Sequence, residues 1–418
     1  MIHPIHRDNQ SANQSANQSA NDSASTLQSP SQAQPHLAQR RLIGALLFGN
    51  FVIGTGAMMV AGMLNQLSAD FALPPPQVAQ LLSAFAIVCG LGAPLLAIGL
   101  ATVGRRAVLT GSLLIYALFH ALAVVTQSFA LLMVVRAFTA IGAAIFTPQA
   151  AATVSLLTPP EHRGKAVGLI FLGWGLASVV GLPLGSYLAA AYHWHVAMGL
   201  VAVLSVLAAG ATWLTVPDGL YGQPIGLAAF KTLLANRAVM RVVGVTVLSA
   251  CGLFSMFSFL APLLRDVVGA SPTQIPLLFA CYGLAGLIGS VVVTRYIDAR
   301  GAARIVALCL ALTTVMLVLW PLASVHVGVA FVVAFLWGAP GFAVNGTQQA
   351  RVIGVAGAMA PVAVALNSSA IYLGQAIGTV AGGVYYSHAP HVLLPWMAAV
   401  FVALAWGLSR RTALRYGV

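Results

Sequence analysis

The stretch GSVVVTRYIDARGAAR, residues Gly289–Arg304, shows the pattern that decides the fold. It ends one long apolar run, which begins near Thr273, and it leads into the next, which begins near Ala303. Its charged residues gather in the turn between the two runs, beside Gly301. An apolar run of about 20 residues can cross the hydrocarbon core of a bilayer as a helix. The stretch therefore predicts a short charged turn that joins two membrane-spanning helices.

The composition extends this pattern to the whole chain. Of the 418 residues, 60% are hydrophobic and only 6% are charged, and the mean hydropathy is +0.93. A soluble domain carries about 25% charged residues on its wetted surface, so most of this surface must face lipid. A soluble globular enzyme is therefore excluded. The net charge of +12 comes from cations scattered along the chain without the basic stripe of a nucleic-acid surface, and we expect no nucleic-acid partner.

Apolar runs follow one another from residue 42 to the C-terminus, separated by short turns that carry Gly, Pro or Arg. With a connection included, each span takes roughly 31 residues, so twelve spans fit. We predict an all-α membrane protein with twelve transmembrane helices in two pseudo-symmetric six-helix bundles. The predicted spans start near Leu42, Gln77, Ala107, Phe129, Lys165, His195, Met240, Thr273, Ala303, His326, Ala358 and His391.

The chain divides into four predicted regions. Residues 1–41 contain the polar repeat SANQSANQSAND and no apolar stretch typical of a secretory signal. Such a segment cannot bury enough apolar area to order itself, so we expect a disordered cytoplasmic tail. Residues 42–216 and 239–418 are expected to form the two bundles. Residues 217–238, the longest interior connection, are expected to form a cytoplasmic linker.

Glycines recur between the two predicted bundles. Gly92, Gly104, Gly181 and Gly185 each have a glycine 197 positions later. An internal repeat of this kind is typical of secondary transporters, in which the substrate binds between the repeats near the midplane of the membrane. We therefore expect a substrate site between the two halves.

Lys and Arg concentrate in alternate loops, and cytoplasmic loops are the ones that carry such an excess. We therefore predict that both termini are cytoplasmic and that the protein lies in a bacterial inner membrane. The cations assigned to the cytoplasmic side are Arg105, Arg106, Arg163, Lys165, Lys231, Arg237, Arg241, Arg295, Arg300, Arg304, Arg351, Arg410, Arg411 and Arg415. The opposite loops hold Asp70, His193, His195, Asp266, His388 and His391, with Arg265 as their only strong cation.

Three segments resemble motifs of the major facilitator superfamily, and the nearest likeness is to its drug/proton-antiporter group, which includes arabinose-type efflux permeases. Gly289–Arg304 is similar to the family's loop motif, RAFTAIGAA (Arg136–Ala144) to its fourth-helix motif, and GLASVVGLPLG (Gly175–Gly185) to its fifth-helix antiporter motif. The resemblance covers the chain from about Leu42 to its end. It implies a transporter that moves a small organic solute (a drug, sugar or metabolite) by alternating access, with export as the expected direction.

Arg136 is the one strong cation inside a predicted span. A charge in the bilayer is costly and by default marks a functional site, although a long stem also lets Arg reach the interface. The resemblance implies a place for Arg136 beside the substrate cavity. The eleventh predicted span carries a polar stripe beside a glycine stripe, which suits a helix that faces a wet cavity or one that hydrogen-bonds its neighbours. The candidate substrate-binding residues are Arg136, Asn50, Thr55, Gln149, Asn345, Asn367, Ser368, Tyr372, Gln375 and Thr379.

Two further groups of residues are candidates for the movement itself. Small residues let helices approach closely, and a proline removes one backbone donor, so the fifth span is expected to be a kinked pivot, with ordinary packing as the alternative. The pivot residues are Gly175, Gly181, Pro183 and Gly185. The candidate gating residues are Gly104, Arg105 and Arg106 in the first loop motif and Asp298, Arg300, Gly301 and Arg304 in the second. The resemblance implies that the Asp of this motif helps lock the cytoplasmic gate, and the first copy has Ala101 in its place.

None of the seven acids lies deep in a predicted span. Proton-driven antiporters usually need a buried carboxylate, and relatives often carry one in the first helix, where this chain has Gly56 and Ala57. His120 in the third span could titrate, although a lone His in an apolar span is more often structural. Coupling therefore stays open between protons carried by the substrate or His120 and an uncoupled facilitator or importer of a small neutral solute. The uncharged polar residues favour neutral or weakly anionic solutes.

Other functions fit less well. The four cysteines fall in apolar runs without C-x-x-C spacing, so we expect no disulfide, metal or cofactor. No nucleophile–base pair or nucleotide motif is present, which argues against an enzyme and against an ATP-driven pump. A transporter-like membrane sensor remains an alternative. We expect a monomer in the lipid bilayer whose partners are a small-molecule substrate and, in a coupled transporter, protons.

Overall fold

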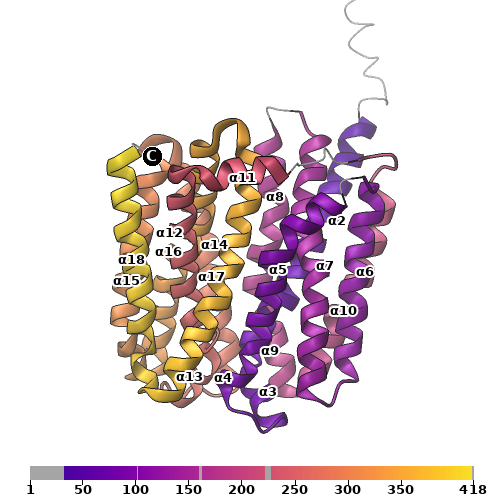
Figure 1. Ribbon diagram of the computed structural model, residues 1–418. Helices are drawn as coiled ribbons and strands as arrows, with labels where there is room; N and C mark the ends of the chain where they lie inside the picture. Colours follow the sequence, from indigo (N-terminus) through magenta and orange to yellow (C-terminus); the bar gives the residue numbers. More distant parts are fainter. Residues whose placement is uncertain (1–32, 101, 160–161, 222–226, 417–418) are drawn as a thin grey trace, which may run out of the picture.

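A computed structural model of the chain describes residues 33–100, 102–159, 162–221 and 227–416. The described residues form long helices that run between two faces of the molecule (Figure 1). The start of α2 and the end of α18 lie on one face, together with α11 (Leu227–Ala235), and we call it the terminal face. The other is the opposite face. The predicted tail lies outside the described residues up to residue 32, and residues 33–41 belong to the first helix.

The helices form two halves that follow each other in the chain. The N-terminal half contains α2 (Ala33–Gly62), α3 (Leu64–Asp70), α4 (Pro75–Val78), α5 (Gln80–Gly99), α6 (Arg105–Val124), α7 (Phe129–Leu156), α8 (Arg163–Leu176), the π-helical turn η2 (Ala177–Gly181), α9 (Leu182–Ala191) and α10 (Trp194–Thr215). The C-terminal half contains α12 (Arg237–Phe257), α13 (Leu260–Asp266), α14 (Gln274–Arg300), α15 (Ala302–Leu319), η3 (Trp320–Ser324), α16 (Val327–Ala356), η4 (Gly357–Met359), α17 (Ala360–His388), η5 (His391–Leu393) and α18 (Leu394–Tyr416).

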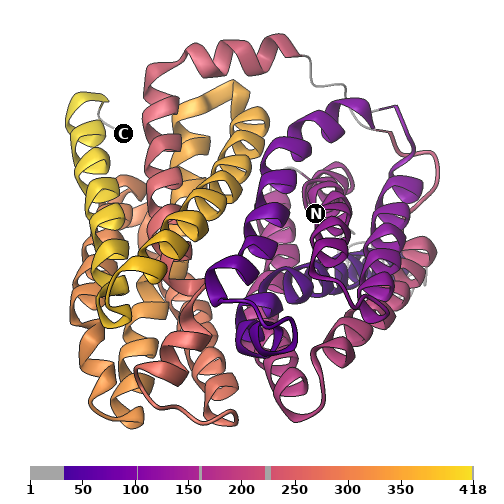
Figure 2. The same cartoon turned by 60° about the horizontal axis from the view of Figure 1, so that its bottom comes forward.

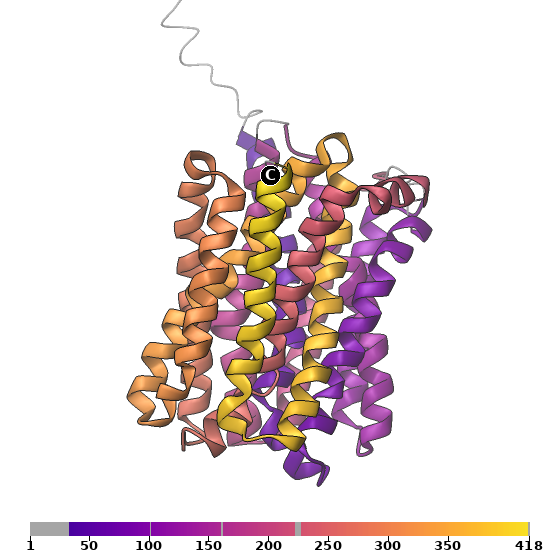
Figure 3. The ribbon, with the colours of Figure 1, turned by 60° about the vertical axis from the view of Figure 1, so that its left-hand side comes forward.

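Among the described residues, eleven helical segments are long and apolar enough to cross a membrane. α17 is of similar length, carries Asn367, Ser368, Ser369 and Gln375 along its middle, and runs through the same layer (Figure 3). The predicted helical multi-pass membrane protein is therefore confirmed. Every predicted span starts within three residues of its helix except the first, which begins at Ala33 rather than near Leu42.

The two halves repeat the same close helix packing. A Cβ atom on Gly181 would overlap Thr55 Oγ1 of α2, and one on Gly378 would overlap the Cys251 carbonyl oxygen of α12. The next glycine of each helix, four residues on, also has no room for a side chain. Small residues make room for such a close approach, so η2 and α9 pack directly on α2, and α17 packs directly on α12.

Several helices are interrupted on the way to the opposite face. The first helix of each half breaks, α2 before α3 and α12 before α13. In the helix formed by α8, η2 and α9, the Leu182 N–H donates to the Ala177 carbonyl oxygen five residues earlier, which makes the wide π turn η2. Pro183 follows directly; it has no N–H, and its ring crowds the carbonyl four residues earlier. The helix widens at that point instead of breaking.

Candidate functional site

Two helix pairs join the halves, which lie side by side in Figure 2. α5 packs on α17, where a Cβ atom on Gly90 would lie 3.3 Å from the Ser369 carbonyl oxygen. α14 packs on η2 and α9, where a Cβ atom on Gly283 would overlap the Ser178 carbonyl oxygen. Glycine therefore allows direct backbone contact across the boundary between the halves.

A cavity lies at this boundary and takes side chains from both halves. It is lined by Ala57 and Met58 of α2, Leu82 of α5, Trp174 of α8, Phe254 and Phe257 of α12, and Tyr372 and Gln375 of α17. We expected a polar cavity, but most of this lining is aromatic or aliphatic. Trp174 Nε1 is buried without a hydrogen-bond partner among the described residues. An apolar pocket with a few convergent polar groups is the usual form of a small-molecule site.

The polar stripe of α17 divides between the cavity and the helix interface. Tyr372 and Gln375 line the cavity, as the substrate-binding prediction requires. The Ser368 hydroxyl donates to its own helix, at the carbonyl oxygen four residues earlier. The Thr379 hydroxyl lies 2.8 Å from Ser258 Oγ, at the break between α12 and α13. The glycines beside the stripe face α12, so this helix packs on one side and meets the cavity on another.

Asn367 belongs to a buried hydrogen-bond network inside the C-terminal half. Its Oδ1 accepts from Thr246 Oγ1 at 2.6 Å, and its Nδ2 donates to Gln349 Oε1 at 2.6 Å. Gln348 Nε2 donates to Thr246 Oγ1 at 3.1 Å. Because α12, α16 and α17 each contribute to it, the network fixes how these three helices sit against one another.

The other uncharged candidates lie away from the cavity. Asn50 Oδ1 accepts from Thr147 Oγ1 at 2.7 Å inside the N-terminal half. The Thr55 hydroxyl donates to a carbonyl of its own helix. Gln149 is buried on α7. Asn345 lines a separate small pocket within the C-terminal half. The structure therefore brings only Tyr372 and Gln375 of the ten predicted residues to the cavity lining.

Arg136 lies inside the N-terminal half with 1% of its surface exposed, so it does not reach an interface. Its Nη1 donates to the Gly56 carbonyl oxygen at 3.1 Å, and its guanidinium carbon lies 4.6 Å from the centroid of the Phe85 ring. Its Nε and Nη2 have no partner among the described residues. Ala57, next to Gly56, lines the cavity, so Arg136 lies behind the cavity wall.

The cations of the first loop motif bind the linker. Arg106 Nη1 lies 3.0 Å from Asp218 Oδ2, and Arg106 Nε donates to the Val216 carbonyl oxygen at 2.7 Å. The backbone N–H of Arg105, which follows the N-cap residue Gly104, donates to the Leu220 carbonyl oxygen at 2.7 Å. These contacts hold the start of the linker against the loop before α6.

The second loop motif ends α14. Gly301 has a φ of 81°, a left-handed conformation that glycine adopts without strain, and it separates α14 from α15. The Arg300 guanidinium carbon lies 5.3 Å from the Tyr296 ring centroid, and Arg304 is exposed. The side chain of Asp298 lies outside the described part of the chain. Arg351, which we assigned to a loop, is buried and donates to Ser409 Oγ at 2.7 Å.

The predicted pivot residues face two neighbours. Gly181 and Gly185 face α2, inside their own half, whereas a Cβ atom on Gly175 would lie 3.1 Å from Leu287 of α14, in the other half. Pro183 follows the π turn. The helix formed by α8, η2 and α9 is therefore irregular where it lies between α2 and the C-terminal half.

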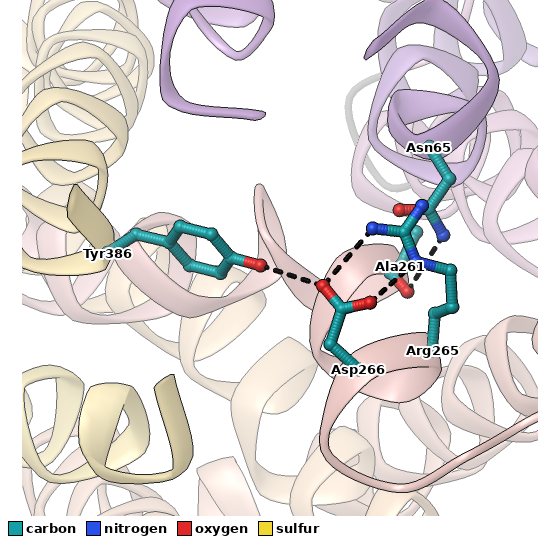
Figure 4. Close-up of polar contacts among 5 residues, drawn as sticks. All are labelled: Asn65, Ala261, Arg265, Asp266 and Tyr386. Carbon is teal, nitrogen blue, oxygen red and sulfur yellow. Dashed lines mark hydrogen bonds and ion pairs between the residues drawn. The ribbon is translucent and has the colours of Figure 1, made fainter. Parts of the chain in front are cut away.

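On the opposite face, a hydrogen bond joins the halves (Figure 4). Asn65 Nδ2 of α3 donates to the Ala261 carbonyl oxygen of α13 at 3.0 Å. Beside it, Arg265 donates two hydrogen bonds to Asp266, at 2.6 and 3.1 Å, and Tyr386 donates to the same carboxylate at 3.2 Å. Among the described residues, the bond from Asn65 to Ala261 is the only side-chain hydrogen bond between the halves.

Sequence reasoning missed the cavity aromatics Trp174, Phe254 and Phe257, because in a lipid-exposed chain an aromatic residue carries no sign of which way it points. It also missed Asn65. A signal for it existed: Asn65 and Ala261 are 196 positions apart, almost the offset of the glycine repeat, so they occupy equivalent places in the two halves.

Comparisons with known proteins agree with this architecture. The family model of the Major Facilitator Superfamily matches residues 46–379. The chain is 31% identical to a Chloramphenicol resistance protein of Streptomyces lividans, over 84% of this chain and 91% of the relative. It is 26% identical to the Inner membrane transport protein YdhP of Escherichia coli K12, over 86% and 93%. It is 24% identical to a Probable sugar efflux transporter of Pasteurella multocida, over 93% and 96%.

Solved structures show the same fold. The D-xylose-proton symporter matches with a TM-score of 0.72 at 16% identity, over 88% of this chain and 96% of that one. The human organic anion transporter MFSD10 (TETRAN) matches with a TM-score of 0.69 at 18% identity, over 89% and 99%. Two helical halves around a shared cavity, a family model over most of the chain and relatives named as transporters agree: this chain is a membrane transporter that belongs to the Major Facilitator Superfamily.

Proposed function

We propose that this transporter exports a small amphipathic solute with an aromatic body and hydrogen-bond acceptors, by alternating access. This proposal depends on the cavity between the halves, in which the indole N–H of Trp174 lies among Phe254 and Phe257 without a hydrogen-bond partner among the described residues. Tyr372 and Gln375 add a hydroxyl and an amide that make no hydrogen bond within the described part of the chain. Aromatic walls hold a ring, and the free polar groups orient it.

Export as the direction is supported by two relatives, one named for chloramphenicol resistance and one for sugar efflux. Of these two kinds of solute, the aromatic lining favours the less polar one, because a sugar needs a hydrogen-bond partner for each buried hydroxyl. A sugar substrate is a distinguishable outcome of the export screen described below.

We further infer that the terminal face is cytoplasmic. The cations of both loop motifs and of the α18 end lie toward this face, whereas Asp70 and Asp266 end α3 and α13 on the other. Cytoplasmic loops carry the excess of Lys and Arg. Reporters fused before Arg40 and after Val418 should both be active only in the cytoplasm, and opposite placements of the two would refute this topology.

The contact between the halves at the opposite face supports a role for Asn65 in gating. Its hydrogen bond to Ala261 ties the halves at the opposite face, whereas the described ion pair at the terminal face, Arg106 with Asp218, lies within one half and its linker. In our proposal, Asn65 closes the outer side while the cavity communicates with the cytoplasm. We also propose that the loop-motif residues act in gating at the cytoplasmic side; these are Gly104, Arg105, Arg106, Asp298, Arg300, Gly301 and Arg304.

An export screen tests the cavity. Deletion and overexpression strains are compared for resistance to chloramphenicol and other amphipathic aromatics, and for export of sugars. Trp174→Ala and Gln375→Ala should each lower the export rate about tenfold or more, since each removes a group that contacts the solute. Trp406→Ala and Gln127→Ala are the matched controls, because both of these side chains are exposed outside the cavity. Full export by both cavity variants would refute this site.

A further inference from the structure

The ends of α12 and α18 at the terminal face carry a patch of arginines that the transport cycle proposed above does not use. It consists of Arg237 and Arg241 of α12 and Arg411 and Arg415 of α18. Residues four positions apart lie on the same side of a helix, so each pair forms a short column. We call these four residues the seam arginines, because α12 and α18 pack side by side (Figure 3).

Two contacts show that the columns face each other. Farther into the helices, a Cβ atom on Gly244 of α12 would lie 3.3 Å from Leu408 Cδ2 of α18. Gly244 lies one turn after Arg241, and Leu408 lies one turn before Arg411, so each belongs to the face of its column. At the helix ends, the Arg241 guanidinium carbon lies 5.3 Å from the centroid of the Tyr416 ring. The arginines of both helices therefore converge on the same seam.

Tyr416 brings two of these charges together. The Arg415 guanidinium carbon lies 5.8 Å from the centroid of the same ring that Arg241 contacts. Because both cations share one ring, they lie closer together than the sum of the two distances. The ring attracts each cation weakly, whereas the two cations repel each other. An anion bound between them would remove this repulsion.

The described residues supply no such anion. None of the seam arginines forms an ion pair or donates a side-chain hydrogen bond in the described part of the chain. The described ion pairs use Asp70, Asp218 and Asp266, and Asp218 pairs with Arg106. Three of the four seam arginines are exposed and Arg241 is half-buried, so an anion can reach them from outside the protein.

Apolar surface continues the seam toward the middle of the molecule. Leu404 lies one turn before Leu408 on the same side of α18, and 55% of its surface is exposed. Apolar side chains on the outer surface of a membrane-spanning helix contact acyl chains. A ligand with an anionic headgroup and apolar chains therefore fits both parts of the seam, whereas a soluble phosphate would use only the arginines.

We propose that the seam arginines bind the phosphate of an anionic phospholipid of the phosphatidylglycerol type, with its chains along α18. Guanidinium groups hold phosphate oxygens through paired N–H donors, and basic pockets between membrane helices are suited to anionic headgroups. A zwitterionic lipid carries a cation beside its phosphate, which the arginines repel. This site depends neither on the cavity nor on the direction of transport, so it stands or fails independently of the proposed function.

Native mass spectrometry of the purified full-length protein tests this site. Protein in a nonionic detergent is titrated with dioleoyl-phosphatidylglycerol and, separately, with dioleoyl-phosphatidylcholine at the same ionic strength. The dissociation constant of the first bound lipid is measured. Wild-type protein should bind phosphatidylglycerol about tenfold more tightly or better. Arg241→Gln and Arg415→Gln should each weaken its binding about fivefold, the factor that one arginine beside an anionic headgroup contributes.

Arg410→Gln is the matched control. Arg410 lies on the same helix end, and its guanidinium carbon is also near an aromatic ring, 5.7 Å from the Trp406 centroid. It follows Leu408 by two residues, which places it on the other side of α18 from the seam. Arg410→Gln removes the same charge and should leave the affinity for phosphatidylglycerol unchanged.

Equal losses in Arg241→Gln, Arg415→Gln and Arg410→Gln would show a diffuse attraction to the charge of this face and would overturn the site. Equal affinity of wild-type protein for the two lipids would overturn it as well. Displacement of the lipid by soluble glycerol phosphate would assign the arginines to a soluble ligand instead. Arg415→Lys keeps the charge and should bind phosphatidylglycerol more tightly than Arg415→Gln; the same loss in both would contradict an electrostatic site. Melting temperatures identify any variant that fails to fold.

Discussion

Gly283→Ala should shift the balance between the conformations of this transporter. Gly283 lies on α14 where it meets η2 of the other half, and an added Cβ would overlap the Ser178 carbonyl oxygen and lie 2.6 Å from the Ser178 carbonyl carbon. Backbone atoms in helices cannot rotate away, so α14 must move off η2. Overpacking of this kind costs about 1–3 kcal/mol. Because the contact joins the halves, we expect that cost to fall on this conformation alone, which gives a shift of about 5- to 150-fold.

Gly378→Ala is the matched control. Its added Cβ would overlap the Cys251 carbonyl oxygen, also a backbone atom, but this contact lies inside the C-terminal half. Both substitutions gain the same helix propensity, about 1 kcal/mol, so that contribution cancels in the comparison. Gly378→Ala should therefore lower the melting temperature without changing the distance between the halves.

Pulsed electron paramagnetic resonance measures that distance. Spin labels at Gln127 and Thr273, both exposed on loops of the opposite face in different halves, are placed in a background without the four native cysteines. Gly283→Ala should move most of the distance distribution to longer values, and Gly378→Ala should leave it where it is in the parent. A folded Gly283→Ala protein with the parental distribution would refute the reasoning, because the contact would then be kept or relieved equally in every conformation.

Three further predictions follow from single contacts. Asn65→Ala removes the 3.0 Å hydrogen bond to Ala261, which is worth about 1 kcal/mol. The population with a longer distance between the same two spin labels should rise about fivefold, and an unchanged population would show that Asn65 does not hold the halves together. Ser409→Ala removes the hydroxyl that accepts from Arg351 at 2.7 Å and should cost about 1.5–3 kcal/mol, seen as a lower melting temperature; an unchanged melting point contradicts it. Pro183→Ala restores a backbone donor after the π turn, and should raise the melting temperature while slowing transport; faster transport would count against the pivot.

The repeat was visible in the sequence because its cause is local. Gly181 and Gly378 must be glycine for their helices to pack closely on a neighbour at the same place in each half, because Gly181 makes room for the Thr55 side chain and Gly378 for the Cys251 carbonyl oxygen. The positions of the helices could also be predicted from the sequence, because an apolar run long enough to span a bilayer satisfies its backbone hydrogen bonds by forming a helix. The first helix is the exception: its start, Ala33–Arg41, is helical but too polar to be recognised from apolar runs.

The candidate site was only partly predictable. The polarity of Tyr372 and Gln375 stands out on an apolar helix, and both line the cavity. The same polarity marks Asn367 and Thr379, which are instead used in hydrogen bonds within the C-terminal half. Polarity shows that a side chain needs a partner, but it does not distinguish a neighbouring helix from a substrate.

What the amino-acid sequence determined by itself is the number and nature of the helices, the twofold repeat and the place of Arg136 in an apolar span. These depend on periodicity and on the cost of exposing polar groups to lipid, and both act within one segment. Only the tertiary structure decided that Trp174 and the phenylalanines of α12 form the cavity, that Asn65 meets Ala261, and that His120 and Arg136 share Gly56. Each of these needs residues from different helices to meet, and their meeting depends on how the helices rotate and pack, which no single segment encodes.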